Sequence, residues 1–382
     1  MSGRISVALI APNYHPVTCG IGDNTMRLGA ELRRRGHRAV VFTHQPAQAH
    51  PEAPDLPVRG VHGTTPLAIA AAVSDAITAD EFSHVIIQYA PQMWGASRFG
   101  SPGLPSLAAG LRERGISVVL IIHELYTPWK WRPDLALGSL LLRLQLGALM
   151  SSCSSIYLTT ETRQRTLARA AAQLSPPRTL KSLRIGPGAL PHRAQRKAGG
   201  HRMGLFSTLA VGKAFDVVLD AFDEIAAVYA DAELLLIGDL GQPGDRRFLA
   251  LSRQIEARRA RTRVHLTGKL PLDEVARIVA SLDLYLFPMS TGANTRSSTL
   301  PLALGAGVPV VAIHGTETDP IFRHGRDVFF ADSLSGPAFA RAALEVFAAP
   351  ALADRLAHGA RELYEEHLTW TRIGDSLLAD LA

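Results

Sequence analysis

The 382-residue chain is predicted to be an α/β protein of two doubly wound, Rossmann-like domains. Three observations predict this class. The length exceeds that of one typical domain, short apolar runs alternate with helical patterns, and a stretch rich in proline and glycine divides two such series. Hydrophobic residues make up 47% of the chain and charged residues 19%, which excludes a disordered chain and a disulfide-rich scaffold.

The first alternating series lies in the amino-terminal half. Its expected strands are short apolar runs with β-branched residues: Ile5–Ala11, Arg38–Thr43, His84–Gln88 and Val118–His123. An amphipathic helix is expected at Gly22–Arg35. Strands that alternate with helices form βαβ units, so this half should contain a parallel sheet.

The second series follows a boundary rich in proline and glycine. Its expected strands are Met203–Ser207, Ala232–Ile237, Val264–Leu266, Leu284–Phe287 and Val308–Ala312. The expected helices are Phe215–Tyr229, Asp245–Ala260, Leu272–Ser281, Ser297–Ala306 and Gly336–Phe347. We therefore place an amino-terminal domain at residues 1–186, a carboxyl-terminal domain at 200–360 and a helical segment at 361–382, where Tyr364 and Trp370 require burial.

The cysteine content and the apolar runs bear on the compartment. Cys19 and Cys153 are far apart in sequence, which fits a reducing compartment and predicts no metal cluster. The longest apolar stretch, Leu135–Met150, falls short of the roughly 20 residues that a membrane span requires. Ile5–Ala11 is too short for a secretory signal. We expect a cytoplasmic protein that can contact the inner face of a membrane peripherally.

Positive charge is concentrated in the middle of the chain. The net charge is +6, yet residues 162–215 contain eleven basic residues and no acidic one. Such a block is either a solvated face or a field that attracts an anionic donor, a lipid diphosphate acceptor or an anionic membrane. For the membrane alternative we expect Arg193, Arg196 and Lys197 to contribute. Nucleic acid is not expected, because no aromatic residues are interleaved with these charges.

Ligands of open parallel sheets bind at the carboxyl ends of the strands, and two such domains facing each other would form a central cleft. After the first expected strand, Gly20 and Gly22 form a Gly-x-Gly turn at a helix start, which can turn free amide groups toward an anion. By itself such a turn is as often a plain tight connection.

Together with four later segments, this turn resembles the GT-B-fold retaining glycosyltransferases of family 4 (group 1). The segments are Leu234–Asp239, Val264–Leu270, Ser281–Pro288 and Ala303–Ala312. The resemblance covers nearly the whole chain and implies a carboxyl-terminal donor domain, an amino-terminal acceptor domain and a last segment that returns to the amino-terminal domain. It implies no cofactor and no metal, the nucleotide-diphosphate sugar being a substrate.

The resemblance implies that a lysine before a helix, here Lys213, binds the donor diphosphate. It also implies that Gly20, Gly22 and Gly268 line the donor site. A lysine there offsets negative charge on the leaving group, although a lone lysine beside glycine is usually a solvated residue. The arginine that the family places five positions earlier is Thr208 in this chain, so half of the cationic clamp is missing.

The donor motif departs further from the family pattern. Two glutamates separated by seven residues are replaced by Asn294 and Leu302. Asn294 can still bond to sugar hydroxyls, whereas Leu302 cannot bind a ribose. Arg296, Ser297 and Ser298 could form a phosphate cradle at a helix start, or the serines could only cap the helix.

The amino-terminal domain supplies the remaining candidates. The resemblance makes His123, at a strand end, a catalytic contact to the donor sugar. Another strand end carries amide and aromatic groups typical of acceptor pockets, namely Gln88, Tyr89 and Trp94. Tyr126, which follows His123 closely, is the fourth acceptor candidate. Trp129 and Trp131 flank Lys130 and could stack on sugars, touch a membrane or be buried.

The sequence therefore predicts a retaining glycosyltransferase that moves a sugar from a nucleotide diphosphate to a sugar, lipid-linked or small-molecule acceptor. The catalytic candidates are His123, Lys213 and Asn294. The alternative is a catalytically degenerate GT-B protein that serves as a partner or scaffold for an active enzyme. A nucleotide-sugar epimerase is a weaker third reading, because no pair of acid and base groups can be assembled.

Overall fold

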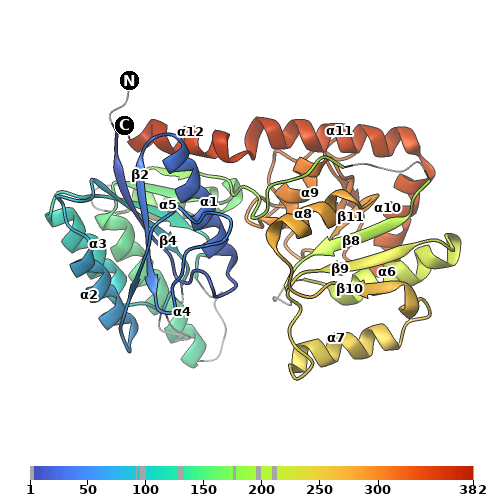
Figure 1. The fold of residues 1–382 in the computed structure, drawn as a ribbon, viewed down its shortest axis with the longest axis horizontal. Helices are drawn as coiled ribbons and strands as arrows, with labels where there is room; N and C mark the ends of the chain where they lie inside the picture. Colours follow the sequence, from blue (N-terminus) through green and yellow to red (C-terminus); the bar gives the residue numbers. More distant parts are fainter. Residues whose placement is uncertain are drawn as a thin grey trace. The chain divides into compact units, whose positions relative to one another are not determined.

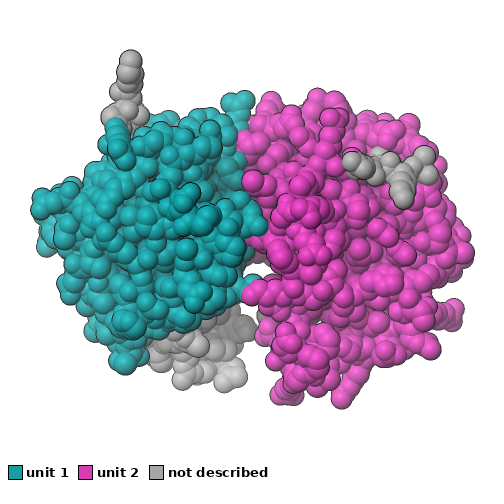
Figure 2. Space-filling model, in the orientation of Figure 1, with its two compact units in different colours: residues 1–184, 370–382 teal, residues 185–369 magenta. Residues whose placement is uncertain are grey.

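The computed structural model describes residues 4–91, 93–94, 100–126, 133–174, 178–194, 199–208 and 213–381. The chain divides into two compact units (Figure 2). The first contains residues 1–184 and 370–382, and the second contains residues 185–369. The predicted α/β architecture of two domains is confirmed, because each unit is built on one parallel sheet with helices packed against it (Figure 1).

The first unit contains a seven-stranded sheet in the order β3-β2-β1-β4-β5-β6-β7. Its strands are β1 (Ser6–Ile10), β2 (Arg38–His44), β3 (Val58–Val61), β4 (His84–Tyr89), β5 (Ser117–Ile122), β6 (Ser155–Leu158) and β7 (Leu180–Ser182). The strand order reverses between β1 and β4, where Ile10 pairs with Ile87. The strands are parallel, so the polar residues that follow them gather at one edge of the sheet.

Six helices accompany this sheet in the described part of the unit. They are α1 (Gly20–Arg34), α2 (Pro66–Ala76), α3 (Gly103–Glu113), α4 (Pro133–Ser152), α5 (Glu161–Ala172) and α12 (Trp370–Leu381). The last of these comes from the end of the chain and packs on α1. Arg35 donates from Nη1 to Asp375 Oδ1 at 2.7 Å and from Nη2 to the Thr371 carbonyl at 2.6 Å, which fixes α12 to the first unit.

The second unit contains a six-stranded sheet in the order β10-β9-β8-β11-β12-β13. Its strands are β8 (Arg202–Phe206), β9 (Glu233–Ile237), β10 (Val264–Leu266), β11 (Leu284–Phe287), β12 (Val310–Ile313) and β13 (Phe329–Ala331). The order reverses between β8 and β11. The loops that follow these two strands therefore diverge at the carboxyl edge of the sheet. Open sheets of this kind bind ligands at that point.

Helices cover both faces of the second sheet. They are α6 (Phe215–Val228), α7 (Arg246–Glu256), α8 (Leu272–Ala280), α9 (Thr299–Ala306), α10 (Gly336–Ala348) and α11 (Pro350–His367). One apolar cluster includes Phe222 of α6 and Phe339 of α10, and another includes Val279 of α8 and Leu304 of α9. The buried strands thus read as continuous apolar runs, as expected of a parallel sheet.

The chain returns to the first unit at Trp370 and not at residue 361. The reason is that α11 continues to His367 and is packed within the second unit. Tyr364 of α11 is buried there, and a Cβ added at Gly305 would lie only 3.0 Å from its ring. Trp370, the first residue of α12, is buried in the first unit. The two aromatic residues that required burial therefore belong to different units.

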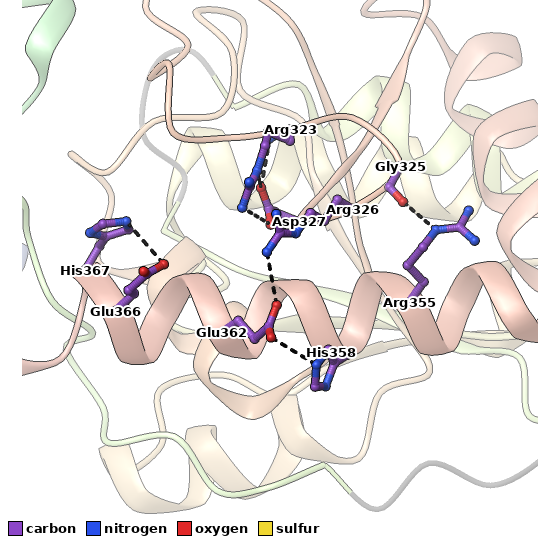
Figure 3. Close-up of polar contacts among 9 residues, drawn as sticks. All are labelled: Arg323, Gly325, Arg326, Asp327, Arg355, His358, Glu362, Glu366 and His367. Carbon is purple, nitrogen blue, oxygen red and sulfur yellow. Dashed lines mark hydrogen bonds and ion pairs between the residues drawn. The ribbon is translucent and has the colours of Figure 1, made fainter.

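A polar network joins the connection between β12 and β13 to α11 (Figure 3). The Asp327 carboxylate is fully buried and accepts from Arg323 Nε at 3.0 Å, while Arg326 reaches it at 3.7 Å. Arg326 also pairs with Glu362 of α11 at 3.2 Å, and Arg355 donates to the Gly325 carbonyl at 2.9 Å. The network therefore holds the second half of the loop between β12 and β13. The first half of that loop, residues 314–319, lies at the carboxyl edge of the second sheet.

Candidate functional site

Unpaired polar atoms mark the carboxyl edge of the first sheet. Tyr14 Oη, Thr43 Oγ1 and Gln88 Nε2 are buried and have no hydrogen-bond partner among the described residues. Thr43 and Gln88 lie near the ends of β2 and β4, and Tyr14 follows β1. Nearly all buried polar groups in proteins are paired. These three groups add hydrogen-bonding capacity to the carboxyl edge, where open sheets of this kind bind ligands.

His123 follows β5 directly and is 3% exposed. Its Nε2 lies 2.5 Å from Gln88 Oε1, and its backbone N donates to the Tyr89 carbonyl at 3.0 Å. Because an amide oxygen only accepts, Nε2 carries the proton in this arrangement. The structure therefore brings three predicted residues together, and the contact with His123 leaves the Gln88 amide nitrogen unpaired. Burial raises the pKa of Tyr89, so its hydroxyl stays neutral.

Arg163 also contacts this group, and the sequence did not indicate its position. The Thr160 side chain caps α5 by accepting from Arg163 N, which directs the first turn of α5 toward β5. Arg163 Nη1 donates to the His123 carbonyl at 2.8 Å, and the side chain is only 9% exposed. The spacing of a threonine three residues before an arginine predicts a cap, but not the partner of the guanidinium.

The loop between β1 and α1 contains the two predicted glycines. A Cβ on Gly22 would lie 2.8 Å from the Asn13 carbonyl oxygen, so only glycine fits without a shift. Gly20 has no atom within 4 Å of such a Cβ. Burial raises the pKa of the neighbouring Cys19, which argues against a reactive thiolate. The loop is therefore a close turn at the start of α1.

Two of the predicted acceptor residues are engaged within the fold. Trp94 packs in the apolar core, is 8% exposed and donates from Nε1 to the Ala11 carbonyl at 3.2 Å. The Arg143 guanidinium lies 3.9 Å above the Tyr126 ring and covers one of its faces. These contacts leave little of either ring for stacking on a sugar. Trp129, Lys130 and Trp131 lie outside the described residues.

Lys213 lies at the switch point of the second sheet. It forms a bridge with Met289, just beyond β11, and the next residue donates its amide to the Pro288 carbonyl at 3.1 Å. Its ammonium group lies 5.0 Å from the centre of the Phe287 ring. Burial, with the positive charge of Arg296, lowers the pKa of Lys213 to about 8. The electrostatic effect of Arg296 means that two cations lie near each other, an arrangement that an anion would stabilise.

Arg296 is 22% exposed, and its Nη2 lies 3.8 Å from Glu317 Oε2 on the loop after β12. The same loop contributes Asp319, whose Oδ2 accepts from both Thr295 N and Thr295 Oγ1 at 2.6 Å. Glu317 and Asp319 are positioning residues that the sequence did not indicate. Their contacts join loops that are more than twenty residues apart in the chain, so no local pattern could reveal them.

Asn294 is enclosed by the protein, and its side chain bonds to neighbouring backbone groups. It is fully buried, its Nδ2 donates to the Gly292 carbonyl at 3.0 Å, and its Oδ1 accepts from Arg296 N at 3.3 Å. Leu302 is also fully buried, in the apolar cluster around α9. Neither serine caps α9 through its side chain, since Ser298 has a helical backbone and Ser297 Oγ lies 2.9 Å from Thr299 Oγ1.

The other donor candidates follow neighbouring strands at the same edge. Thr208 is exposed just after β8, and Gly268 is exposed just after β10 with a φ of 68°. Between them, Gly238 follows β9 with a φ of 114°, and a Cβ there would lie 2.4 Å from the Ser207 carbonyl oxygen. The edge of the second sheet thus combines close backbone turns with Lys213 and Arg296.

The eleven basic residues of 162–215 are divided between the two units. Several are engaged in ion pairs: Lys181 with Asp380, Arg184 with Glu161, and Arg202 with Glu233. Arg193 is exposed, whereas Arg196 and Lys197 lie outside the described residues. Among the residues described, His, Cys, Asp and Glu side chains form no group of three that could hold a metal. Within the described ranges, no helix is long and apolar enough to cross a bilayer.

Comparison with known proteins finds a family model that matches most of the second unit. Residues 200–349 match the sequence model of Glycosyl transferases group 1. No curated protein matches the chain significantly in sequence. The family match spans the strands and loops that hold Lys213, Gly268 and Arg296.

Solved structures match both units together. HepE of Anabaena, solved with UDP and glucose, has a TM-score of 0.76 at 15% identity, with 99% of each chain covered. Sucrose-phosphate synthase of Thermosynechococcus elongatus has a TM-score of 0.73 at 15% identity, with 98% of each covered. The pneumococcal O-GlcNAc transferase GtfA, solved with UDP and GlcNAc, has a TM-score of 0.73 at 10% identity and covers 99% of this chain and 98% of its own. The fold of this chain is therefore that of GT-B glycosyltransferases.

Proposed function

We propose that this protein is a glycosyltransferase that transfers a sugar from a nucleotide diphosphate with retention of configuration. The observation that carries the proposal is the pair of cations, Lys213 and Arg296, at the switch point of a sheet whose sequence matches the group 1 glycosyltransferases. HepE and GtfA were both solved with UDP. A uridine nucleotide is accordingly the first donor to test.

Lys213 and Arg296 would hold the diphosphate in this proposal. Burial and the charge of Arg296 lower the pKa of Lys213, so the ammonium gains stability when a phosphate oxygen approaches. Arg296 would supply the second positive charge that Thr208 does not supply, and a guanidinium can bind two phosphate oxygens at once. Glu317 would hold Arg296 in place until the phosphate competes for it.

The reaction would break the bond between the anomeric carbon and the diphosphate oxygen and form a bond from that carbon to an acceptor oxygen. Retention follows if the acceptor attacks on the side from which the diphosphate leaves, and a leaving-group oxygen then takes the acceptor proton. Charge develops on the diphosphate as the bond breaks, which is where fixed cations lower the barrier. The hydrogen-bonded pair of His123 and Gln88 in the first unit would orient sugar hydroxyls.

The test is a transfer assay with a panel of UDP-, GDP- and ADP-sugars that measures nucleoside diphosphate release. Proton NMR of the product reports the anomeric configuration. We expect one donor class to turn over with retention, and Lys213→Ala and His123→Ala each to lower turnover at least tenfold in protein that circular dichroism shows to be folded. A tenfold loss corresponds to about 1.4 kcal/mol of transition-state stabilisation.

Arg259→Gln is the matched control, since Arg259 is an exposed arginine of the same unit that precedes the amino end of β10. Its turnover should equal that of the unchanged protein. An inverted product would contradict retention. No turnover, together with no thermal shift from any nucleotide, would favour the scaffold function instead.

A further inference from the structure

Strands β8 and β11 are neighbours in the second sheet, yet they pair over only two residues (Figure 1). Leu284 pairs with Met203 and Tyr285 with Gly204. Beyond this point the strands diverge, and the loops that follow them carry the two cations of the candidate phosphate site. The groups that hold the diverging strand ends in place therefore influence the shape of that site.

Phe206, the last residue of β8, has no strand partner on the side of β11. Ser207 N donates to the Ile237 carbonyl of β9 at 2.9 Å. Successive residues of a strand direct their backbone groups to opposite neighbours, so the N–H and C=O of Phe206 point toward β11. Backbone groups away from water need hydrogen-bond partners, and the ladder no longer supplies them here.

The Tyr285 hydroxyl supplies both missing bonds. It accepts from Phe206 N at 3.1 Å and donates to the Phe206 carbonyl at 3.2 Å. The side chain is 1% exposed, and burial raises the pKa of Tyr285 to about 12. The hydroxyl therefore keeps its proton and serves as a hydrogen-bonding group rather than as an acid.

Thr299, the first residue of α9, extends this contact to the helix. Its side chain is hydrogen-bonded to the Tyr285 hydroxyl, and its Oγ1 lies 2.9 Å from Ser297 Oγ. Tyr285 gives its only proton to the Phe206 carbonyl, so Thr299 is the donor to Tyr285. Ser297 must then donate to Thr299. Three hydroxyl groups thus form a chain from the end of β8 to the start of α9.

This chain links the two sides of the candidate phosphate site. Strand β8 precedes Lys213, and α9 begins just after Arg296. Phe287 lies two residues after Tyr285 and on the same face of β11, and the Lys213 ammonium lies 5.0 Å from the centre of its ring. Tyr285 therefore lies next to the residue that supports one cation and is bonded to the helix start that follows the other.

We propose that Tyr285 is a positioning residue of the phosphate site, whose hydroxyl sets the spacing between the end of β8 and the start of α9. The inference rests on the proposed function, because it concerns the site assigned to the donor diphosphate. The simpler alternative is a hydroxyl that stabilises the sheet and does not affect ligand binding. The two alternatives differ in how a folded variant without the hydroxyl recognises phosphate.

The test is isothermal titration of the full chain with nucleoside diphosphates and their monophosphates, in uridine, guanosine and adenosine pairs. We expect Tyr285→Phe to lower the preference for the diphosphate about tenfold, because the two cations lose their preorganised spacing. Thr299→Val should have the same effect. Thr299→Ser keeps the hydroxyl and should retain the preference of the unchanged protein.

The double variant, Tyr285→Phe with Thr299→Val, distinguishes a chain from two independent contacts. In a chain the second change removes nothing further, so the loss should stay near tenfold, whereas independent contacts would give about a hundredfold loss. Tyr229→Phe is the matched control, since Tyr229 precedes β9 at the opposite edge of the sheet and its ring stacks on His201. Its affinities should equal those of the unchanged protein.

An undiminished preference in Tyr285→Phe would overturn the inference and leave the proposed function intact. Equal losses in Thr299→Val and Thr299→Ser would do the same. If Tyr285→Phe does not fold, the Thr299 variants decide, because Thr299 is only half-buried. Diphosphate binding without sugar transfer would contradict the proposed function alone, and the variants would still test the inference. No diphosphate binding by the unchanged protein would contradict both.

Discussion

The carboxyl edges of the two sheets differ in chemical character. In the second unit the edge carries two cations, Lys213 and Arg296, close enough that one lowers the pKa of the other. In the first unit the edge carries the hydrogen-bonded pair of His123 and Gln88 and three unpaired buried atoms, and the Arg163 guanidinium there is bound to the His123 carbonyl. The two edges therefore differ in how their positive charge is used: paired within the fold in the first unit, and shared between two neighbouring cations in the second.

Under the proposed function, this difference would divide the reaction between the two units. The cations of the second unit would stabilise a diphosphate, and the hydrogen-bonding groups of the first would orient hydroxyl groups. The following predictions test whether the two edges are as different as their side chains indicate.

The largest effect is expected on the cationic edge. Lys213→Gln should weaken binding of a nucleoside diphosphate by about 10- to 100-fold, because a charge-assisted hydrogen bond contributes roughly 1.5–3 kcal/mol. Isothermal titration measures this. Arg259→Gln, on the same unit, should bind like the unchanged protein, and equal losses in both variants would mean that only net charge matters.

In the first unit, Arg163→Met should lower the free energy of unfolding by about 1–3 kcal/mol, because it leaves the buried His123 carbonyl without its donor. Chemical denaturation measures the loss. As a positioning residue, Arg163 should also affect the kinetic constants: Arg163→Lys should recover part of kcat with KM for the donor unchanged. If KM for the donor rises instead, Arg163 acts on the donor and not through His123.

The pH dependence separates the two edges further. Lys213 has a pKa of about 8 and gains a partner when the diphosphate binds, so its pKa rises in the complex. The affinity is therefore fully present below pH 8 and is lost as pH rises above it, about tenfold by pH 9. Lys213→Arg, which stays charged, should remove this decline in titrations between pH 7 and 9. A decline that persists in that variant would assign the titration to another group.

The smallest effect concerns the glycine turn of the first unit. Gly22→Ala should cost about 1 kcal/mol of stability or more, because its Cβ would meet the Asn13 carbonyl at 2.8 Å. Gly20→Ala is the matched control, since nothing lies within 4 Å of its Cβ. Thermal unfolding of both variants distinguishes them, and equal melting temperatures would show that the loop relaxes freely.

The fold could be predicted because its signals are local. The runs at β1, β4 and β5 are continuous and apolar, whereas the missed strands β3, β6, β7 and β13 have only three or four residues each, too few to give a clear pattern. The site was predictable only in part. Lys213 stands in a recognisable segment, but the contacts of Arg163 and Glu317 join residues 40 and 21 positions apart. Asn294 was expected to face a sugar, and its amide instead holds the turn that carries Arg296.

The most direct test of the central claim compares a nucleoside diphosphate with its monophosphate on the unchanged protein and on Lys213→Gln with Arg296→Gln combined. Titrations with UDP and UMP, then with the guanosine and adenosine pairs, give the contribution of the second phosphate. We predict that the unchanged protein binds one diphosphate at least tenfold more tightly than its monophosphate and that the double variant binds both equally. Equal affinities on the unchanged protein, or an undiminished preference in the double variant, would contradict the assignment of the cationic edge to the donor diphosphate.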